Sequence, residues 1–271
     1  MKKIIQLGSL LEVDFKRSIY SWKFLFIVIG ICAVCLSSMT DSISSIIRFD
    51  LPRENFSSVR ELMIMLNFDR FKTVIIVLLA GIYSASYCED WNHRYFRLIL
   101  CRSGLKIYTL SRIIAIIVSV VLATILGFFL CILVLSPIMG IDMQEQDVSW
   151  YNAYQSLALR FPLGFALILG WNFGLCAAFL ALFGLWMSVK QPNGFVAIGA
   201  PFLLFYFLYA ISMLFPSFLS FNAITSNPSI AFIGNPILSF LYNTGVLGLL
   251  IILTSLGFYC SLRKRWKNGL F

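Results

Sequence analysis

The sequence predicts an all-α, polytopic membrane protein with six transmembrane helices, and three observations predict it. Hydrophobic residues make up 60% of the 271 residues and charged residues 12%, against about 25% charged residues in soluble domains. The mean hydropathy is +0.89. The apolar residues form long unbroken runs, which favours helices over the alternating strands of a transmembrane barrel. We therefore expect residues 1–271 to form a single helical membrane domain embedded in a lipid bilayer.

Six apolar runs without Lys, Arg, Asp or Glu predict the spans, at about 20 residues for each crossing. They are residues 24–40, 73–88, 113–139, 163–187, 195–215 and 244–262. The second run is short, and snorkelling of Lys72 would extend it. The third and fourth runs are long, so their helices should tilt or project from the membrane.

The positive-inside rule orients these spans. With the N-terminus inside, the inner segments hold 15 of the 21 basic residues and 4 of the 12 acidic residues, a net charge of +11. The outer segments carry a net charge of −2. Both termini are therefore expected in the cytoplasm. Because the basic balance is a topology signal, we do not infer nucleic-acid binding from it.

Residues 1–22 predict an amphipathic helix that lies in the membrane interface. Apolar residues recur at spacings of three and four, at Ile4, Leu7, Leu11, Phe15 and Ile19. Lys16 and Arg17 lie broadly opposite this stripe, as in interfacial helices. The mixture of charge and apolar residues argues against a cleavable signal peptide. A loosely ordered lead-in to the first span is the alternative.

Several kinds of chemistry lack the residues that they need. There is no phosphate-binding G-x-x-x-x-G-K-[ST] loop, so this chain is not expected to hydrolyse ATP or to hold a cofactor. The Cys32–Cys35 pair lies within an apolar run and His93 is the single histidine, so we expect neither a metal site nor disulfides. The six runs contain no ionisable Asp, Glu, Lys, Arg or His, which disfavours an ion-coupled carrier.

The segment that joins spans two and three concentrates charged and aromatic side chains. Acidic residues open it, where they suit the positive end of a helix dipole, and Gly104 offers a stop. We predict one short amphipathic helix over residues 89–105 on the cytoplasmic side. Its candidate partner-binding residues are Glu89, Asp90, Trp91, Arg94, Tyr95, Arg97 and Arg102, of types that anchor interfaces. A membrane-surface helix held by charge and tryptophan is the alternative.

This layout resembles the type-2 permeases of ABC exporters. In that family an acidic residue leaving the second span opens a coupling helix, which docks on a separate ATP-binding subunit; Glu89 and the run "RLILCRSGLKIYTLSR" match it. The family's Gly-Thr pair and proline are replaced here by residues 92–95 and 102–104. The resemblance implies an ATP-binding-cassette partner that carries ATP and Mg, and a second permease chain, identical or related. It also implies a bacterial cytoplasmic membrane.

Residues 216–243 form an outer segment without a single charge. Pro216, Pro228 and Pro236 divide it into pieces too short to cross the bilayer. The resemblance implies re-entrant helices before span six, and we expect Pro228, Asn235 and Pro236 to mark an outer gate. Asparagines 222, 227 and 235 should face water or cap helix starts. An ordinary apolar extracellular loop is the alternative.

These observations lead to an expected permease subunit of an ATP-driven exporter, without enzymatic activity of its own. The 26 phenylalanines suit an amphipathic cargo such as a bacteriocin-type peptide, in export or immunity, or a hydrophobic drug. The alternative, favoured for most of these phenylalanines, is that they face lipid. Export of a lipid-linked polysaccharide is the related alternative. A non-ABC secondary carrier and a membrane immunity protein are alternatives from other classes.

Overall fold

The computed structural model describes residues 2–49, 56–68, 71–144, 153–212, 214–216, 220–226 and 235–268. Within these ranges every regular element is an α-helix, apart from an isolated β-bridge between Ser57 and Gly140. The all-α class predicted from composition is confirmed for the part of the chain that is described.

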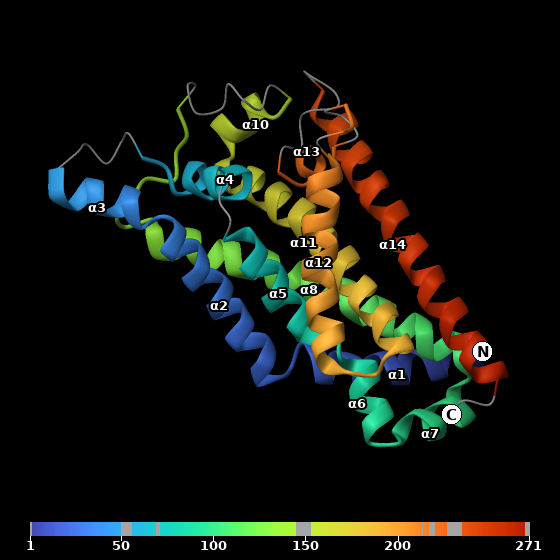
Figure 1. Cartoon of the computed structure of the whole chain (residues 1–271). Coiled ribbons are helices and arrows are strands. Elements are labelled where there is room, and N and C mark those ends of the chain that lie inside the picture. Colours follow the sequence, from blue (N-terminus) through green and yellow to red (C-terminus); the bar gives the residue numbers. More distant parts are fainter. Residues whose placement is uncertain are drawn as a thin grey trace.

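Among the described residues, five helical segments are long and apolar enough to cross a membrane (Figure 1). They are α5 with α6 (Lys72–Tyr83 and Ser86–Asn92), α8 (Leu105–Leu135), α11 (Pro162–Lys190), α12 (Gly194–Ser212) and α14 (Pro236–Lys267). A bent pair provides a sixth candidate, because α1 (Lys2–Ser18) and α2 (Trp22–Ser38) meet at 52°. Five or six candidate spans are compatible with the predicted polytopic membrane protein.

Two of the long helices begin earlier than the apolar runs predicted. Helix α8 begins at Leu105 rather than at 113, and α14 begins at Pro236 rather than at 244. Their 31 and 32 residues correspond to about 46–48 Å, which exceeds a hydrocarbon core of about 30 Å. Charged and polar residues at their ends therefore continue helices that apolar runs alone would have ended.

Helix α11 is the central helix of the bundle, with α8, α12 and α14 around it (Figure 1). In its most apolar stretch, 83% of the residues of α11 are buried within the protein, against 17% for α12 and 28% for α14. Gly257 of α14 allows close packing, because a Cβ there would lie 2.8 Å from the Trp186 ring of α11. Small residues allow such close approach of membrane helices. The outward faces of α12 and α14 are left to meet lipid or another chain.

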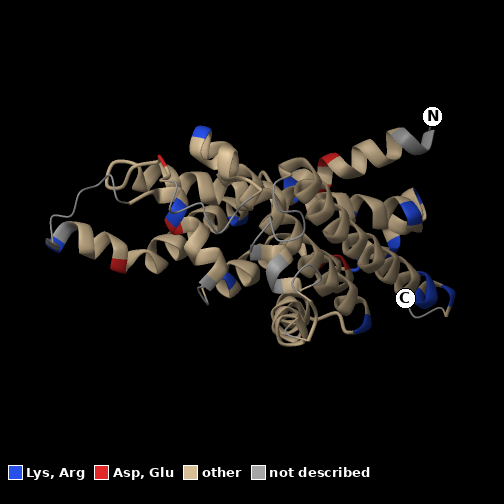
Figure 2. Cartoon of the chain, turned by 90° about the horizontal axis from the view of Figure 1, so that it is seen from above, with Lys and Arg blue, Asp and Glu red and all other residues tan. Residues whose placement is uncertain are grey.

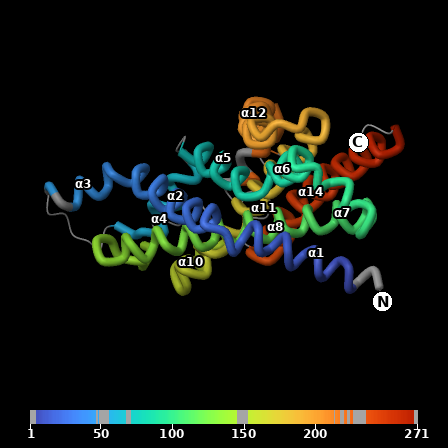
Figure 3. Tube along the Cα trace, turned by 90° about the horizontal axis from the view of Figure 1, so that it is seen from below, coloured from blue at the N-terminus to red at the C-terminus, as the bar shows by residue number. Residues whose placement is uncertain are grey.

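Helix α1 runs along α8 and packs against it (Figure 3). Its inward stripe includes Leu11 and Phe15, as the periodicity predicted, but also the fully buried side chains of Asp14 and Ser18. Ser21 caps the start of α2 by accepting a hydrogen bond from the Phe24 backbone N–H at 3.3 Å. The chain turns here from the first helix into the first candidate span.

Basic side chains collect at one end of the bundle, here called the basic end. It comprises α1, the start of α2, α6 with α7 (Tyr95–Ser103), and the last turns of α11 and α14 (Figure 1). Figure 2 shows Lys and Arg around the C-terminal end of α14. The start of α1 and the end of α14 both lie at this end, in keeping with an even number of crossings.

In the described part of the chain, four short helices lie at the opposite end, three of them outside the predicted segments. These are α3 (Thr40–Phe49), α4 (Ser58–Phe68) and α10 (Gln155–Arg160), with α13 (Phe221–Ser226) inside the predicted outer segment. Ser42 of α3 donates a hydrogen bond to Glu61 of α4 at 2.8 Å. The carboxylate of Glu61 is thereby buried without being left unsatisfied.

Candidate functional site

The segment predicted as one helix over residues 89–105 is two helices, α6 and α7, joined by a sharp turn. The two helices and the turn together are here called the elbow. Helix α6 ends at Asn92, Arg94 has a φ of 59°, and α7 begins at Tyr95. A left-handed backbone is uncommon for a residue other than glycine. Gly104, with a φ of 78°, then separates α7 from α8. Because glycine has no Cβ, it adopts this positive φ without a steric penalty.

A buried aromatic ring holds the elbow in this shape. Phe96 is 2% exposed and packs edge-on against Tyr87 and Tyr108, with ring centroids 5.4 and 5.3 Å apart. Trp91 completes the cluster, 6.2 Å from Phe96. Packing of this ring between α6 and α8 offsets the strained backbone at Arg94.

The turn separates side chains that a single helix would have placed on one face. Trp91 is half-buried, and the Arg265 guanidinium from α14 lies 5.3 Å above its ring. Tyr95 and Leu98, by contrast, are 58% and 68% exposed. Trp91 therefore faces the bundle while Tyr95 and Leu98 face outward, because the break at Arg94 rotates α7 relative to α6.

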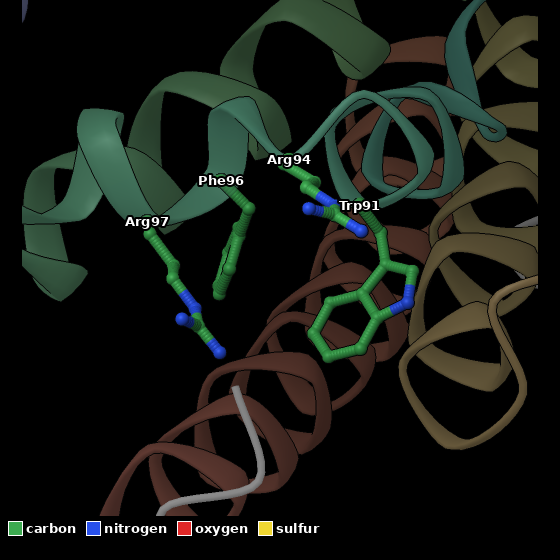
Figure 4. A pocket seen from close by; sticks show the side chains of 4 residues that line it. All are labelled: Trp91, Arg94, Phe96 and Arg97. Atoms are coloured by element: carbon green, nitrogen blue, oxygen red, sulfur yellow. The ribbon is translucent and has the colours of Figure 1, made fainter.

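The predicted arginines lie on different surfaces of the elbow. Arg94 and Arg97 line a pocket of about 370 Å³ together with Trp91 and Phe96 (Figure 4). Arg102 lines a second pocket, of about 280 Å³, between α7 and α1. All three side chains are exposed.

The two acidic residues of α6 bind the protein's own arginines. Asp90 is 1% exposed, accepts hydrogen bonds from Arg17 at 3.0 Å and from the Tyr108 hydroxyl at 3.0 Å, and pairs with Arg112. Glu89 accepts from Arg17 at 3.1 Å and from Lys23 at 3.2 Å, and is partly exposed. Asp90 is therefore corrected from a partner-facing position to an internal one, because two arginines enclose its carboxylate.

Asp14 of α1 forms the second half of the same network. It accepts a hydrogen bond from the Tyr83 hydroxyl at 2.9 Å and from Ser111 at 2.5 Å, and lies 3.1 Å from an Arg112 nitrogen. The Arg112 guanidinium lies 5.1 and 5.2 Å from the ring centres of Tyr83 and Tyr108. A cation between two rings and two carboxylates ties α1, α5, α6 and α8 together.

Arg112 is a charged residue in one of the long helices, whereas the predicted apolar runs contained none. Since α8 begins at Leu105, this arginine lies within a helix that is a candidate span, and its side chain is 1% exposed. It belongs to a cluster of three acids and three bases: Asp14, Glu89, Asp90, Arg17, Lys23 and Arg112. The cluster is balanced and paired throughout, as a structural anchor requires.

At the opposite end, α13 is pinned against the central helix. The buried Asn172 of α11 donates to the Ile224 backbone carbonyl at 2.6 Å. Phe221 inserts between Phe179 of α11 and Phe205 of α12, with ring centroids 6.3 and 6.1 Å apart. The start of α13 thus enters the bundle between two spans.

The predicted gate residues fall into two groups. Asn235 caps α14, accepting from the Leu238 backbone N–H at 3.2 Å, and Pro236 occupies the first turn. This helix-start role for Asn235 was predicted and is confirmed. Pro236 opens the long last helix instead of a separate short one, because no break follows it. Pro228 lies outside the described residues.

The cysteines and acids give no sign of a metal centre. In the described ranges, no three His, Cys, Asp or Glu side chains form a group suited to a metal ion, and all seven cysteines are free thiols.

Asp14, Arg17 and Arg112 are the important residues that sequence reasoning missed. The available signal was Asp14 itself, an acid placed on the apolar stripe of α1 between Leu11 and Phe15.

A comparison with protein-family models, curated proteins and solved structures finds no match for this chain. Any functional proposal therefore depends on the layout of the helices and the geometry of the basic end.

Proposed function

We propose that this chain is the transmembrane permease subunit of an ATP-driven ABC exporter. The observation that carries the proposal is the elbow at the basic end: α6, which ends the candidate span begun by α5, turns sharply into the short helix α7, which leads into the candidate span α8. Exposed Tyr95 and Leu98 on α7 offer a docking surface, while Phe96 and Asp90 fix the elbow to the bundle. Motion imposed on α7 would be passed directly to α8, since Gly104 alone separates them.

Two further features support the same proposal. The basic end, taken as cytoplasmic, would face soluble ATP-binding subunits that carry ATP and Mg. Helix α13, seated between α11 and α12, corresponds to a re-entrant element near an outer gate. A second permease chain would meet the exposed apolar faces of this one to complete the translocation path. The aromatic face of α12, with Phe202 and Tyr206 partly exposed, suits an amphipathic peptide or hydrophobic cargo.

Reconstitution with a candidate ATP-binding subunit tests the proposal. Tyr95→Ala combined with Leu98→Ala should weaken co-purification and cargo-stimulated ATP hydrolysis, by about tenfold or more for loss of interface anchors. Tyr20→Ala is the matched control, since Tyr20 is 83% exposed at the same end but outside the elbow. Equal behaviour of the elbow variant and the control would reject docking at α7. A chain that transports cargo without any ATP-binding partner would be a carrier of another class.

A further inference from the structure

The basic end holds more cations than its acids neutralise. Each of its four acidic residues is already paired with a base within 3.2 Å: Glu12 with Lys16, Asp14 with Arg112, Glu89 with Arg17 and Lys23, and Asp90 with Arg17. Among the described residues, neither Arg94 nor Arg97 has an acidic partner. Two guanidinium groups at the elbow are therefore without a counter-charge from the described protein.

These two arginines share one pocket. They line the cavity of about 370 Å³, in which the Phe96 ring lies between the Arg97 side chain and the Trp91 indole (Figure 4). The guanidinium of Arg94 lies beside the indole, and α14 passes along the far side of the cavity. Arg265 of α14 covers Trp91, which adds a third positive charge nearby.

The start of α7 adds to this positive potential. Arg94 provides no side-chain cap, and the first turn contains no acidic residue. Peptide N–H groups at an uncapped helix start favour an anion. The pocket thus combines two guanidinium groups, a helix start and an apolar wall of Trp91 and Phe96.

We propose that this pocket binds the phosphate headgroup of an anionic phospholipid. A guanidinium group can donate two parallel hydrogen bonds to the oxygens of one phosphate. Tryptophan side chains are enriched at the headgroup level of a bilayer. A phospholipid is the phosphate source that accompanies a membrane-embedded chain, and its glycerol and upper acyl carbons would meet the apolar wall. The bound lipid would bridge the elbow to α14 and offset one of the two positive charges of Arg94 and Arg97.

Lipid titration of the purified chain, without any ATP-binding subunit, tests this proposal independently of the proposed function. The midpoint of thermal unfolding in detergent is measured against added phosphatidylglycerol, phosphatidylcholine or inorganic phosphate. Phosphatidylglycerol should stabilise the chain and should be retained in native mass spectra. Arg94→Gln combined with Arg97→Gln should raise the concentration needed by about tenfold or more, since each basic residue adds appreciable attraction to an anionic lipid.

Arg102→Gln combined with Lys106→Gln is the matched control. It removes the same charge from exposed neighbours that do not line this pocket, and it should leave the titration unchanged. An equal loss in both double variants would overturn the proposal in favour of diffuse surface charge. Equal stabilisation by inorganic phosphate would assign the pocket to free phosphate, and equal stabilisation by phosphatidylcholine would remove the anion requirement. If the mass spectra of the unaltered chain show no retained phosphatidylglycerol, the proposal is overturned even where a variant folds poorly.

Discussion

Arg17 of α1 donates a hydrogen bond to Asp90 of α6 at 3.0 Å, although 73 residues separate them along the chain. Asp90 also pairs with Arg112, which in turn lies 3.1 Å from Asp14. One charged network thus joins α1 to α6 through Arg17 and to α8 through Asp14. The position of α1 depends on these buried charges as well as on the apolar stripe.

Removing the central cation should destabilise the protein strongly. Arg112→Leu would leave Asp14 and Asp90 buried with half of their compensation gone, which costs about 3 kcal/mol or more. Lys23→Ala should cost at most about 1 kcal/mol, because its ion pair with Glu89 is solvent-exposed. Thermal unfolding of both variants in one detergent checks the difference. Similar losses in the two variants would contradict a network centred on Arg112.

Two Tyr→Phe substitutions should have opposite effects. Tyr83→Phe removes a hydroxyl that bonds Asp14 and Arg112, leaving charged groups unsatisfied at a cost of about 1–3 kcal/mol. The Tyr154 hydroxyl is buried and has no hydrogen-bond partner among the described residues, so Tyr154→Phe should be neutral or stabilising. Unfolding midpoints at pH 7 compare the two.

The same Tyr154 substitution predicts a change at high pH. Burial raises the pKa of Tyr154 from 10.0 to about 12. The unfolded chain therefore loses this proton first, and folding stability falls as the pH rises from about 10 to 12. Tyr154→Phe should reduce that fall relative to the unaltered chain. An identical pH profile for both proteins would show that this phenol does not contribute.

The seat of α13 predicts protection from labelling. In a background with the native cysteines replaced, Phe221→Cys should react slowly with a membrane-impermeant thiol reagent, because the position lies between α11 and α12. Asp142→Cys, at an exposed charged position, should react fast from the same side. Equal rapid labelling would mean that α13 lies in an open loop, and the outer-gate proposal would fail with it.

Reporter fusions test the orientation. Fusions after residue 268 should report a cytoplasmic location, and fusions within residues 140–158 the opposite side, given the +11 balance of the inner segments. A C-terminus found outside would place the elbow away from any cytoplasmic partner.

Apolar runs predicted the existence and order of the long helices because burial in lipid requires just such runs. They did not predict where α8 begins, since Arg112 satisfies its charge through Asp14 and Asp90, partners on other helices. A contact between residues about 100 positions apart leaves no periodic trace in the sequence.

The sequence predicted a helical segment at residues 89–105, but it did not predict that this segment is bent into two helices. The segment's aromatic and basic composition marked residues 89–105, but nothing local in Arg94 signals a left-handed backbone. That conformation depends on Phe96 packing between Tyr87 and Tyr108, which is a tertiary effect. The burial of Asp90 and the exposure of Tyr95 both follow from it.

The network around Asp14 also sets an order for biosynthesis. Asp14 is made early, but its partners Tyr83 and Ser111 follow 69 and 97 residues later. At roughly 5–20 residues per second, the ribosome needs about 5–20 s to supply the second partner. During that interval the Asp14 carboxylate lacks the Ser111 hydroxyl and the Arg112 guanidinium that bind it in the folded protein. The final docking of α1 is therefore a late step, completed only when α8 has emerged and been inserted.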